Sequence, residues 1–118
     1  MIKNDNCIFC KIAAGCIPCD KVYEDDKVLA FRDIAPMAKT HIVIIPKEHI
    51  LSGLGDVTEE NAGIIADVHL AAAKIARDMG IEKTGCRIVN NCGADAGQTV
   101  FHIHFHLLGG EALGGFGR

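Results

Sequence analysis

Short apolar runs separated by polar turns fill the first half of the chain and predict local elements. Residues 9–14 are amphipathic and are followed by glycine and proline, which predicts a short helix. Residues 21–24 and 28–31 flank a pair of aspartates and predict two strands joined as a hairpin. Residues 41–45 are mostly β-branched and stop at Pro46, so we expect a central strand covered on both faces.

The second half contains one long run with helical spacing. Thr58 is the expected N-cap, two glutamates follow in the first turn, and Gly80 is the expected end. The apolar stripe of this helix consists of Ile65, Val68, Ala72, Ile75 and Met79. His69 lies off the stripe and is expected at the surface or in an interface. Residues 86–90 and 100–108 predict two more strands. The order indicates an α+β fold, an antiparallel sheet of about five strands with one long helix and a short N-terminal helix.

Composition indicates one globular domain, residues 1–118. With 49% hydrophobic residues, 118 residues bury a core without disulfides. The net charge of -3 and the scattered lysines and arginines argue against binding nucleic acid through bulk charge, whereas a small anionic ligand fits. No long apolar stretch opens the sequence, so we expect no signal peptide, no membrane partner and a cytoplasmic location.

Six cysteines are many for that compartment. Two C-x-x-C pairs, Cys7 with Cys10 and Cys16 with Cys19, fit metal binding or redox chemistry better than a secreted disulfide framework. No thioredoxin-like βαβ pattern surrounds the second pair, so free thiols are expected there.

His102, His104 and His106 alternate in the run 101–108 and form the densest chemistry in the chain. In an extended strand they share one face, about 7 Å apart, while the apolar residues between them, beginning with Phe101, line the other. A half-buried strand that carries histidines is one interpretation. A zinc site and covalent catalysis by one imidazole are the others, and three histidines together favour a functional site.

The loop 91–99 leads directly into the histidines and is rich in glycine. Glycine lets backbone N–H groups approach a phosphate closely, so this loop is a candidate anion cradle. An ordinary hairpin loop has the same composition, and only the adjacent histidines favour the cradle.

Residues 102–108 follow the pattern His-φ-His-φ-His-φ-φ, with φ apolar, and the chain resembles the Hint branch of the histidine triad family. The resemblance covers nearly the whole chain. Further matching positions are Ile8-Phe9, Glu24-Asp25-Asp26, Ala30 to Ile34, Pro36, Thr40-His41, Ile45-Pro46-Lys47, His49-Ile50, the approach Gly97 to Phe101, and Gly109-Gly110. It implies a HIT-like fold and a homodimer in which the long helix and a strand meet their symmetry mates. Residues 64–79 would then serve this interface, and core packing is the alternative use of the same apolar residues.

The resemblance implies a nucleotidyl hydrolase that cleaves purine nucleoside phosphoramidates, such as AMP linked to an amine, with aminoacyl-adenylates as a further class. His104 would attack the phosphorus and form a nucleotidyl-histidine intermediate. His102 and His106 would bind phosphate oxygens or orient the reactive ring, and His41 would orient it through a hydrogen bond. Gly97 and Thr99 would hold the phosphoryl group.

The resemblance also implies a purine nucleotide (AMP or GMP) site. Asp33 would accept from the ribose hydroxyls, and Asn91 would contact the phosphate or the ribose. Gln98 belongs to the same loop. An apolar slot for the base would consist of Ile8, Phe9, Ile12, Ile17, Phe31 and Ile34.

A structural zinc is implied by the first cysteine pair. Its ligands would be Cys7, Cys10, His49 and His102, two sulfurs and two nitrogens as tetrahedral zinc prefers. The alternative joins Cys7 and Cys10 to Cys16 and Cys19, across a spacing shorter than that of a usual zinc ribbon. Zinc would fix the ring of His102 and would not take part in the chemistry.

Two other functions are compatible with the same residues. A dinucleoside polyphosphate hydrolase would use the same nucleophile, and a nucleotide-binding or interaction module would keep the site with little turnover. A DNA-repair role like that of aprataxin is disfavoured, because no basic patch follows the triad. The tail 111–118 lacks the tryptophan-containing end of eukaryotic Hint proteins, which leaves the preferred amine open.

Overall fold

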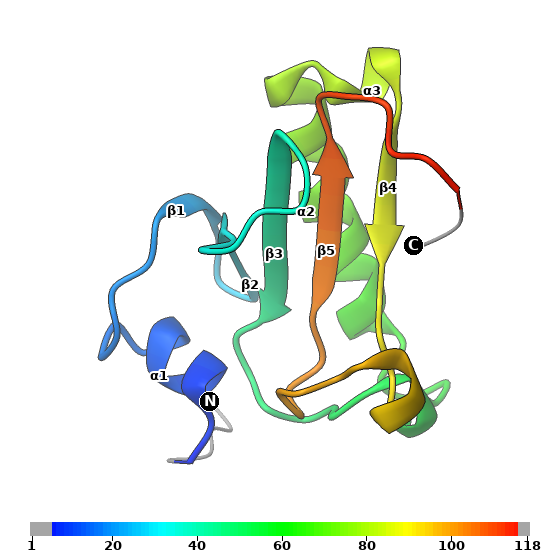
Figure 1. Ribbon diagram of the computed structural model, residues 1–118. Helices are drawn as coiled ribbons and strands as arrows, with labels where there is room; N and C mark the ends of the chain where they lie inside the picture. Colours follow the sequence, from blue (N-terminus) through cyan, green and yellow to red (C-terminus); the bar gives the residue numbers. More distant parts are fainter. Residues whose placement is uncertain (1–5, 116–118) are drawn as a thin grey trace.

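A five-stranded antiparallel sheet organises the computed structural model, which describes residues 6–115 (Figure 1). The strands are β1 (Lys21–Glu24), β2 (Val28–Arg32), β3 (Thr40–Pro46), β4 (Cys86–Val89) and β5 (Phe105–Gly109). Their order across the sheet is β1-β2-β3-β5-β4, and every neighbouring pair is antiparallel. The predicted α+β fold is confirmed. The predictions that concern residues 1–5 and the last three residues of the tail, 116–118, lie outside the described part of the chain.

The helices pack on opposite faces of this sheet. They are α1 (Ile8–Ala13), α2 (Gly63–Met79) and α3 (Ile81–Thr84), with single 3-10 turns at η1 (Leu54–Asp56) and η2 (Ala94–Ala96). The long helix α2 crosses one face (Figure 1), where it packs on Ile42 and Ile44. On the other face Val43 and Ile45 pack beside α1. Because strand side chains alternate, β3 is buried on both sides, as predicted for a central strand.

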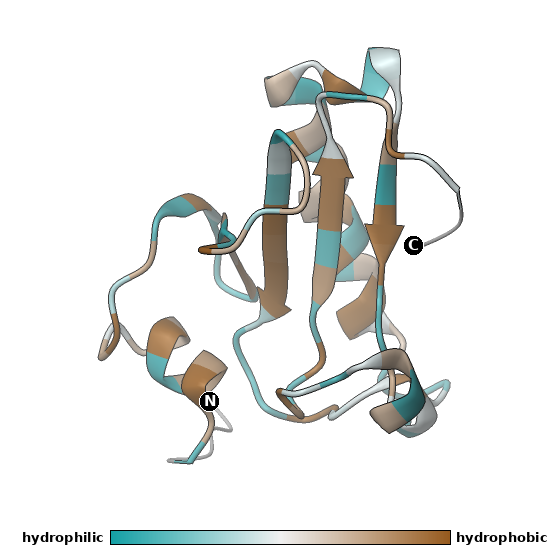
Figure 2. Cartoon of the chain, viewed as in Figure 1, coloured by the Kyte–Doolittle hydropathy of each residue, from teal (hydrophilic) through white to brown (hydrophobic). Residues whose placement is uncertain are grey.

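In Figure 2 most of the length of the central strands β3 and β5 has the colour of hydrophobic residues. None of the helices within residues 6–115 is long and apolar enough to cross a bilayer. None of the six cysteines, all of which lie within the described residues, forms a disulfide.

The helix α2 begins later than predicted. Thr58 is not its cap, because the helix starts at Gly63 with Ala62 as the N-cap residue and no side-chain cap. The Asn61 side chain instead accepts from the Thr58 N–H at 2.7 Å and donates to a backbone carbonyl at 2.9 Å, which folds residues 58–62 into a turn. The predicted end is confirmed, since Gly80 has φ 75° in the left-handed region that favours glycine. The four-residue α3 was not predicted.

The strand β5 is also shorter than predicted. It begins at Phe105, so His106 is its only triad member, and His102 and His104 lie in the irregular segment before it. If the pairing with β3 continued, Pro46 would face Ile103, and proline has no N–H to donate to the ladder. The Ile103 N–H donates to the Leu51 carbonyl at 2.8 Å instead. Phe101 is 54% exposed and does not line the core face as expected.

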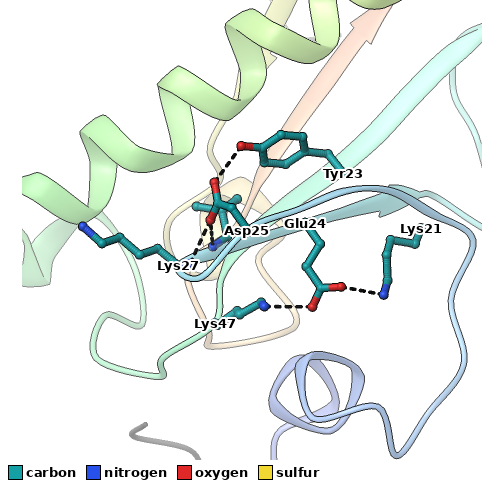
Figure 3. Close-up of polar contacts among 7 residues, drawn as sticks. Lys21, Tyr23, Glu24, Asp25, Lys27 and Lys47 are labelled. Atoms are coloured by element: carbon teal, nitrogen blue, oxygen red, sulfur yellow. Dashed lines mark hydrogen bonds and ion pairs between the residues drawn. The ribbon is translucent and has the colours of Figure 1, made fainter.

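Polar contacts fix the predicted hairpin between β1 and β2 (Figure 3). Asp25 Oδ1 accepts from two backbone N–H groups of the turn at 2.8 Å, and its Oδ2 accepts from the Tyr23 hydroxyl at 2.7 Å. Glu24 lies between Lys21 and Lys47, at 2.6 and 2.8 Å. Hydrogen bonds from both lysines lower the pKa of the Glu24 carboxyl. The edge hairpin is thereby tied to the segment that follows β3.

Candidate active site and metal cluster

His41 on β3 and His106 on β5 lie together on the sheet face opposite α2. In the register His106 pairs with Val43, so His41 is its diagonal neighbour, two residues away on the same face. Their nearest ring nitrogens, His41 Nε2 and His106 Nδ1, are 2.8 Å apart. The ring of His104 lies beside them, with its centroid 5.3 Å from that of His106.

His104 is oriented by its own backbone neighbour. Its Nδ1 lies 2.9 Å from the carbonyl oxygen of His102, which can only accept, so Nδ1 carries the proton. In a neutral ring Nε2 then has the free lone pair. The Asn90 side chain donates to the His104 carbonyl at 2.9 Å, and the Phe9 ring meets the imidazole edge-on at 4.9 Å between centroids. His104 thus presents a nucleophilic nitrogen in a defined direction.

A second chain of hydrogen bonds fixes the proton positions of the other two rings. The Met37 N–H donates to His41 Nδ1 at 3.0 Å, so the proton of His41 is on Nε2. This Nε2–H donates to His106 Nδ1, which leaves the proton of His106 on its Nε2. The site therefore combines a lone pair on His104 with a hydrogen-bond donor on His106.

Burial favours the neutral form of the His41 and His106 rings. It lowers the pKa of His41, an effect that the nearby Asp33 carboxylate opposes, and Asp33 Oδ2 lies 3.4 Å from His41 Nε2. Burial, followed by the neighbouring His104 and His41, also lowers the pKa of His106.

The free energy of unfolding is expected to fall as the pH drops below about 6.5, the ordinary pKa of histidine. In that range the unfolded chain protonates His41 and His106 while the folded chain does not, so protons favour the unfolded state. Urea unfolding between pH 7.5 and 5.5 measures the effect. His69→Ala, at an exposed site, should leave the slope with pH nearly unchanged. Equal stability across this range would contradict the assignment.

A cavity of about 400 Å³ opens beside His104 and His106. Among the predicted nucleotide residues its lining contains Ile8, Phe9, Ile12, Phe31, Asp33, Ile34, Asn91, Gly97, Gln98 and Thr99. Ile17, assigned to the base slot from the sequence, does not line it. Val43 and Val100 line it and were missed. The position of Val43, two residues after His41 on the same strand face, was the available signal.

The loop 91–99 is held by its own hydrogen bonds. The Gly97 N–H, expected to hold a phosphoryl group, donates to the Ala94 carbonyl at 3.0 Å. The buried Gln98 side chain accepts from the Gly93 N–H at 2.8 Å and donates to two carbonyls, those of Ser52 at 2.7 Å and Val100 at 3.1 Å. Gln98 therefore shapes the loop, while Thr99 is exposed and lines the cavity.

Replacing Gln98 with alanine is expected to lower the free energy of unfolding by about 2–3 kcal/mol, because three hydrogen bonds are lost at a buried position. Urea denaturation measures the change. Asp95→Ala, at an exposed position of the same loop, should stay within about 0.5 kcal/mol of the parent. A Gln98 variant as stable as the control would show that the loop does not depend on this side chain.

Cys7, Cys10, His49 and His102 form a cluster that can hold a metal ion, with all four ligand atoms within 4.8 Å of one another. His102 Nδ1 is 3.4 Å from Cys7 Sγ and 3.5 Å from Cys10 Sγ, and His49 Nδ1 is 3.3 Å from Cys10 Sγ. Tetrahedral zinc, with bonds of about 2.3 Å to sulfur and 2.0 Å to nitrogen, separates such atoms by about 3.5 Å. The donor set fits that geometry.

The tautomer of His102 fits as well. Its Nε2 lies 2.7 Å from the Pro46 carbonyl, so Nε2 carries the proton and Nδ1 points its lone pair at the sulfurs. Both ring nitrogens are engaged and the residue is fully buried, so His102 does not contact phosphate oxygens as expected. Its backbone carbonyl, in contrast, accepts a hydrogen bond from the His104 ring. The alternative set with Cys16 and Cys19 is not formed: Cys16 is exposed, and Cys19 packs against the cluster around Phe31.

Asp33, His41 and His106 also place three donor atoms within 4.8 Å of one another. They suit a hydrogen-bonded array better than a metal. A metal would need the lone pair of His41 Nε2, but the Met37 N–H occupies Nδ1 and leaves the proton on Nε2. The interpretation of the triad as three imidazoles that converge on one zinc does not fit the structure, since His102 faces the cysteines and His106 faces His41.

Comparison with known proteins identifies the family. The model of the HIT domain matches residues 14–113. A purine nucleoside phosphoramidase of Escherichia coli K12 is 48% identical over 107 residues, which cover 91% of this chain and 89% of that protein. A histidine triad protein from Clostridium difficile superposes with a TM-score of 0.93 at 46% identity, covering 98% of this chain and 99% of the other. A HIT family hydrolase from Clostridium thermocellum gives a TM-score of 0.92 at 48% identity, with 98% and 100% covered. The chain belongs to the HIT family.

Proposed function

We propose that this protein is a purine nucleoside phosphoramidase that works through a nucleotidyl-histidine intermediate at His104. The observation that carries the proposal is the bond from His104 Nδ1 to the His102 carbonyl, which leaves the Nε2 lone pair for attack beside the cavity. The E. coli relative named for this activity, 48% identical, supports the same conclusion. The reaction class is hydrolysis of a P–N bond.

The arrangement supports a double displacement. His104 Nε2 attacks the α-phosphorus, and the bond to the amine breaks while a bond to imidazole forms. The departing nitrogen accepts a hydrogen bond from the Nε2–H of His106 and takes up one proton from solvent, so that it leaves as the amine. The positive charge on the modified His104 ring faces the His102 carbonyl at 2.9 Å. Water then attacks the phosphorus, the bond from phosphorus to His104 Nε2 breaks, and AMP is formed while one proton of the water returns to solvent.

The nucleotide is proposed to lie in the cavity with its base against the apolar side chains of α1 and β2. Ile8 and Ile34 are 46% and 101% exposed although they line the cavity, so a planar purine would cover apolar surface there. Asp33 is proposed to accept from the ribose hydroxyls, and Asn91 and Thr99 to contact the ribose or the phosphoryl oxygens.

We also propose that zinc occupies the Cys7, Cys10, His49 and His102 cluster, where it stabilises the fold and supplies no step of the reaction. The domain is proposed to span the whole chain and to act in the cytoplasm as a homodimer through α2 and β4. Supporting the dimer, β4 is an edge strand, and Ile88 and Leu70 are 39% and 63% exposed on these elements.

The test compares wild-type hydrolysis of an adenosine phosphoramidate with that of a diadenosine polyphosphate. Faster cleavage of the phosphoramidate supports the proposal. Preference for the polyphosphate would make the protein a dinucleoside polyphosphate hydrolase. AMP binding without turnover of either compound would leave a nucleotide-binding module.

A further inference from the structure

The metal cluster and the nucleotide cavity share the short helix α1. Cys7 caps this helix, its sulfur accepting from the Cys10 N–H at 3.4 Å, and both cysteines belong to the cluster. Ile8, Phe9 and Ile12 of the same helix line the cavity. The six-residue helix and its N-cap residue therefore carry two of the four cluster residues and three residues of the proposed base slot.

The attachment of α1 to the domain depends strongly on the cluster. Cys10 is its only buried residue, whereas Phe9 and Ile12 are partly buried against Phe31 and its neighbours. A helix of six residues is too short to be stable in isolation. With a metal bound, the bonds from Cys7 and Cys10 to the metal would connect the helix to His49 and His102, the other two ligands. Without it, thiol–imidazole contacts hold the same position less firmly.

His102 provides a second connection. Its ring belongs to the cluster, while its carbonyl accepts from His104 Nδ1 at 2.9 Å. Phe9 also meets both imidazoles edge-on, with centroid distances of 6.0 Å to His102 and 4.9 Å to His104. The position of the His102 ring and the orientation of the His104 ring are thus mechanically linked.

We propose that metal binding at the cluster and purine nucleotide binding in the cavity are positively coupled, so that each ligand raises the affinity for the other. This inference rests on the proposed nucleotide site. The metal orders α1 and His102 in advance, and the nucleotide then binds without the cost of ordering them itself. The zinc site is in this way a determinant of nucleotide affinity in addition to a stabiliser of the fold.

The experiment measures both directions of the coupling. Calorimetric titration with AMP compares metal-free protein with protein that carries one equivalent of zinc and no free zinc. We expect AMP to bind roughly fivefold or more tightly to the loaded form. Chelator competition, with and without saturating AMP, gives the zinc affinity, which must rise by the same factor because linkage is reciprocal.

A matched pair of histidine variants separates the loss of coupling from a general loss of stability or of AMP binding. His49 is a cluster ligand that lies off α1 and outside the cavity lining, and His69 is an exposed histidine on α2. His49→Ala should weaken zinc binding while its metal-free form binds AMP as metal-free wild type does. His69→Ala should keep the full coupling factor.

Each remaining outcome overturns the inference in a distinguishable way. Equal AMP affinity of the loaded and metal-free forms would overturn the coupling and leave the proposed function intact. If AMP bound to neither form, the proposed nucleotide site would fail together with the coupling. If circular dichroism found the metal-free chain unfolded, zinc would act on the whole fold instead of α1, and the local coupling would be wrong.

Discussion

Replacing His104 with alanine is expected to lower the rate of adenosine phosphoramidate hydrolysis by roughly 10⁴-fold or more and to abolish the nucleotidylated protein. The variant loses the His104 Nε2 lone pair, which the 2.9 Å bond from Nδ1 to the His102 carbonyl leaves available beside the cavity. His106 cannot replace it, because its Nδ1 accepts from His41 at 2.8 Å and its Nε2 holds the proton. Single-turnover kinetics with intact-mass detection measure rate and adduct together.

His69→Ala is the control for this variant, because it removes an exposed imidazole that lies outside the cavity lining. It should retain the wild-type rate and the adduct. The His104 variant should still bind AMP, since the apolar slot and Asp33 are intact. Turnover close to the wild-type rate in the variant, or an adduct of unchanged mass shift, would exclude His104 as the nucleophile.

The fold follows from local patterns except where the hydrogen bonds of particular side chains or backbone groups compete with them. The strands β1, β2 and β3 formed where their apolar runs predicted, and β3 is central because both of its faces are apolar. The predicted first turn of α2 does not form, because the Asn61 side chain accepts a hydrogen bond from the Thr58 N–H and stabilises a turn there. The strand β5 starts late because its extension would pair with a proline.

The site was predictable to the extent that its residues lie close together in sequence. Residues 102–106 carry the triad, but Cys7 and His102 are 95 positions apart, and only the family resemblance joined them. The structural roles of Asn90 and Gln98 were missed because their partners are backbone carbonyls and N–H groups in other segments. Hydrogen bonds of that kind leave no periodic signal in a sequence.

The reference state is the wild-type protein with free zinc at about a thousand times its Kd, where binding contributes about 4 kcal/mol to the free energy of unfolding. Removal of zinc by chelator, or replacement of Cys10 with alanine, is expected to remove this contribution. Cys10 is the buried ligand of α1 and lies within 3.3–3.5 Å of both cluster histidines. For a domain of 118 residues this loss lowers Tm by roughly 15 °C. Calorimetry of the zinc-loaded protein, with and without chelator, measures the shift.

The matched control for Cys10→Ala is Cys16→Ala, which removes an exposed thiol outside the cluster. Its free energy of unfolding should stay within about 0.5 kcal/mol of the parent, and chelator should lower its Tm as it does in the wild type. The Cys10 variant should be insensitive to chelator, because the ion that the chelator removes is no longer held. Equal losses in the two cysteine variants would mean that the second C-x-x-C pair contributes to the metal site. If chelator had no effect on any of the three proteins, thiol–imidazole hydrogen bonds alone would stabilise the cluster, and the zinc assignment would be wrong.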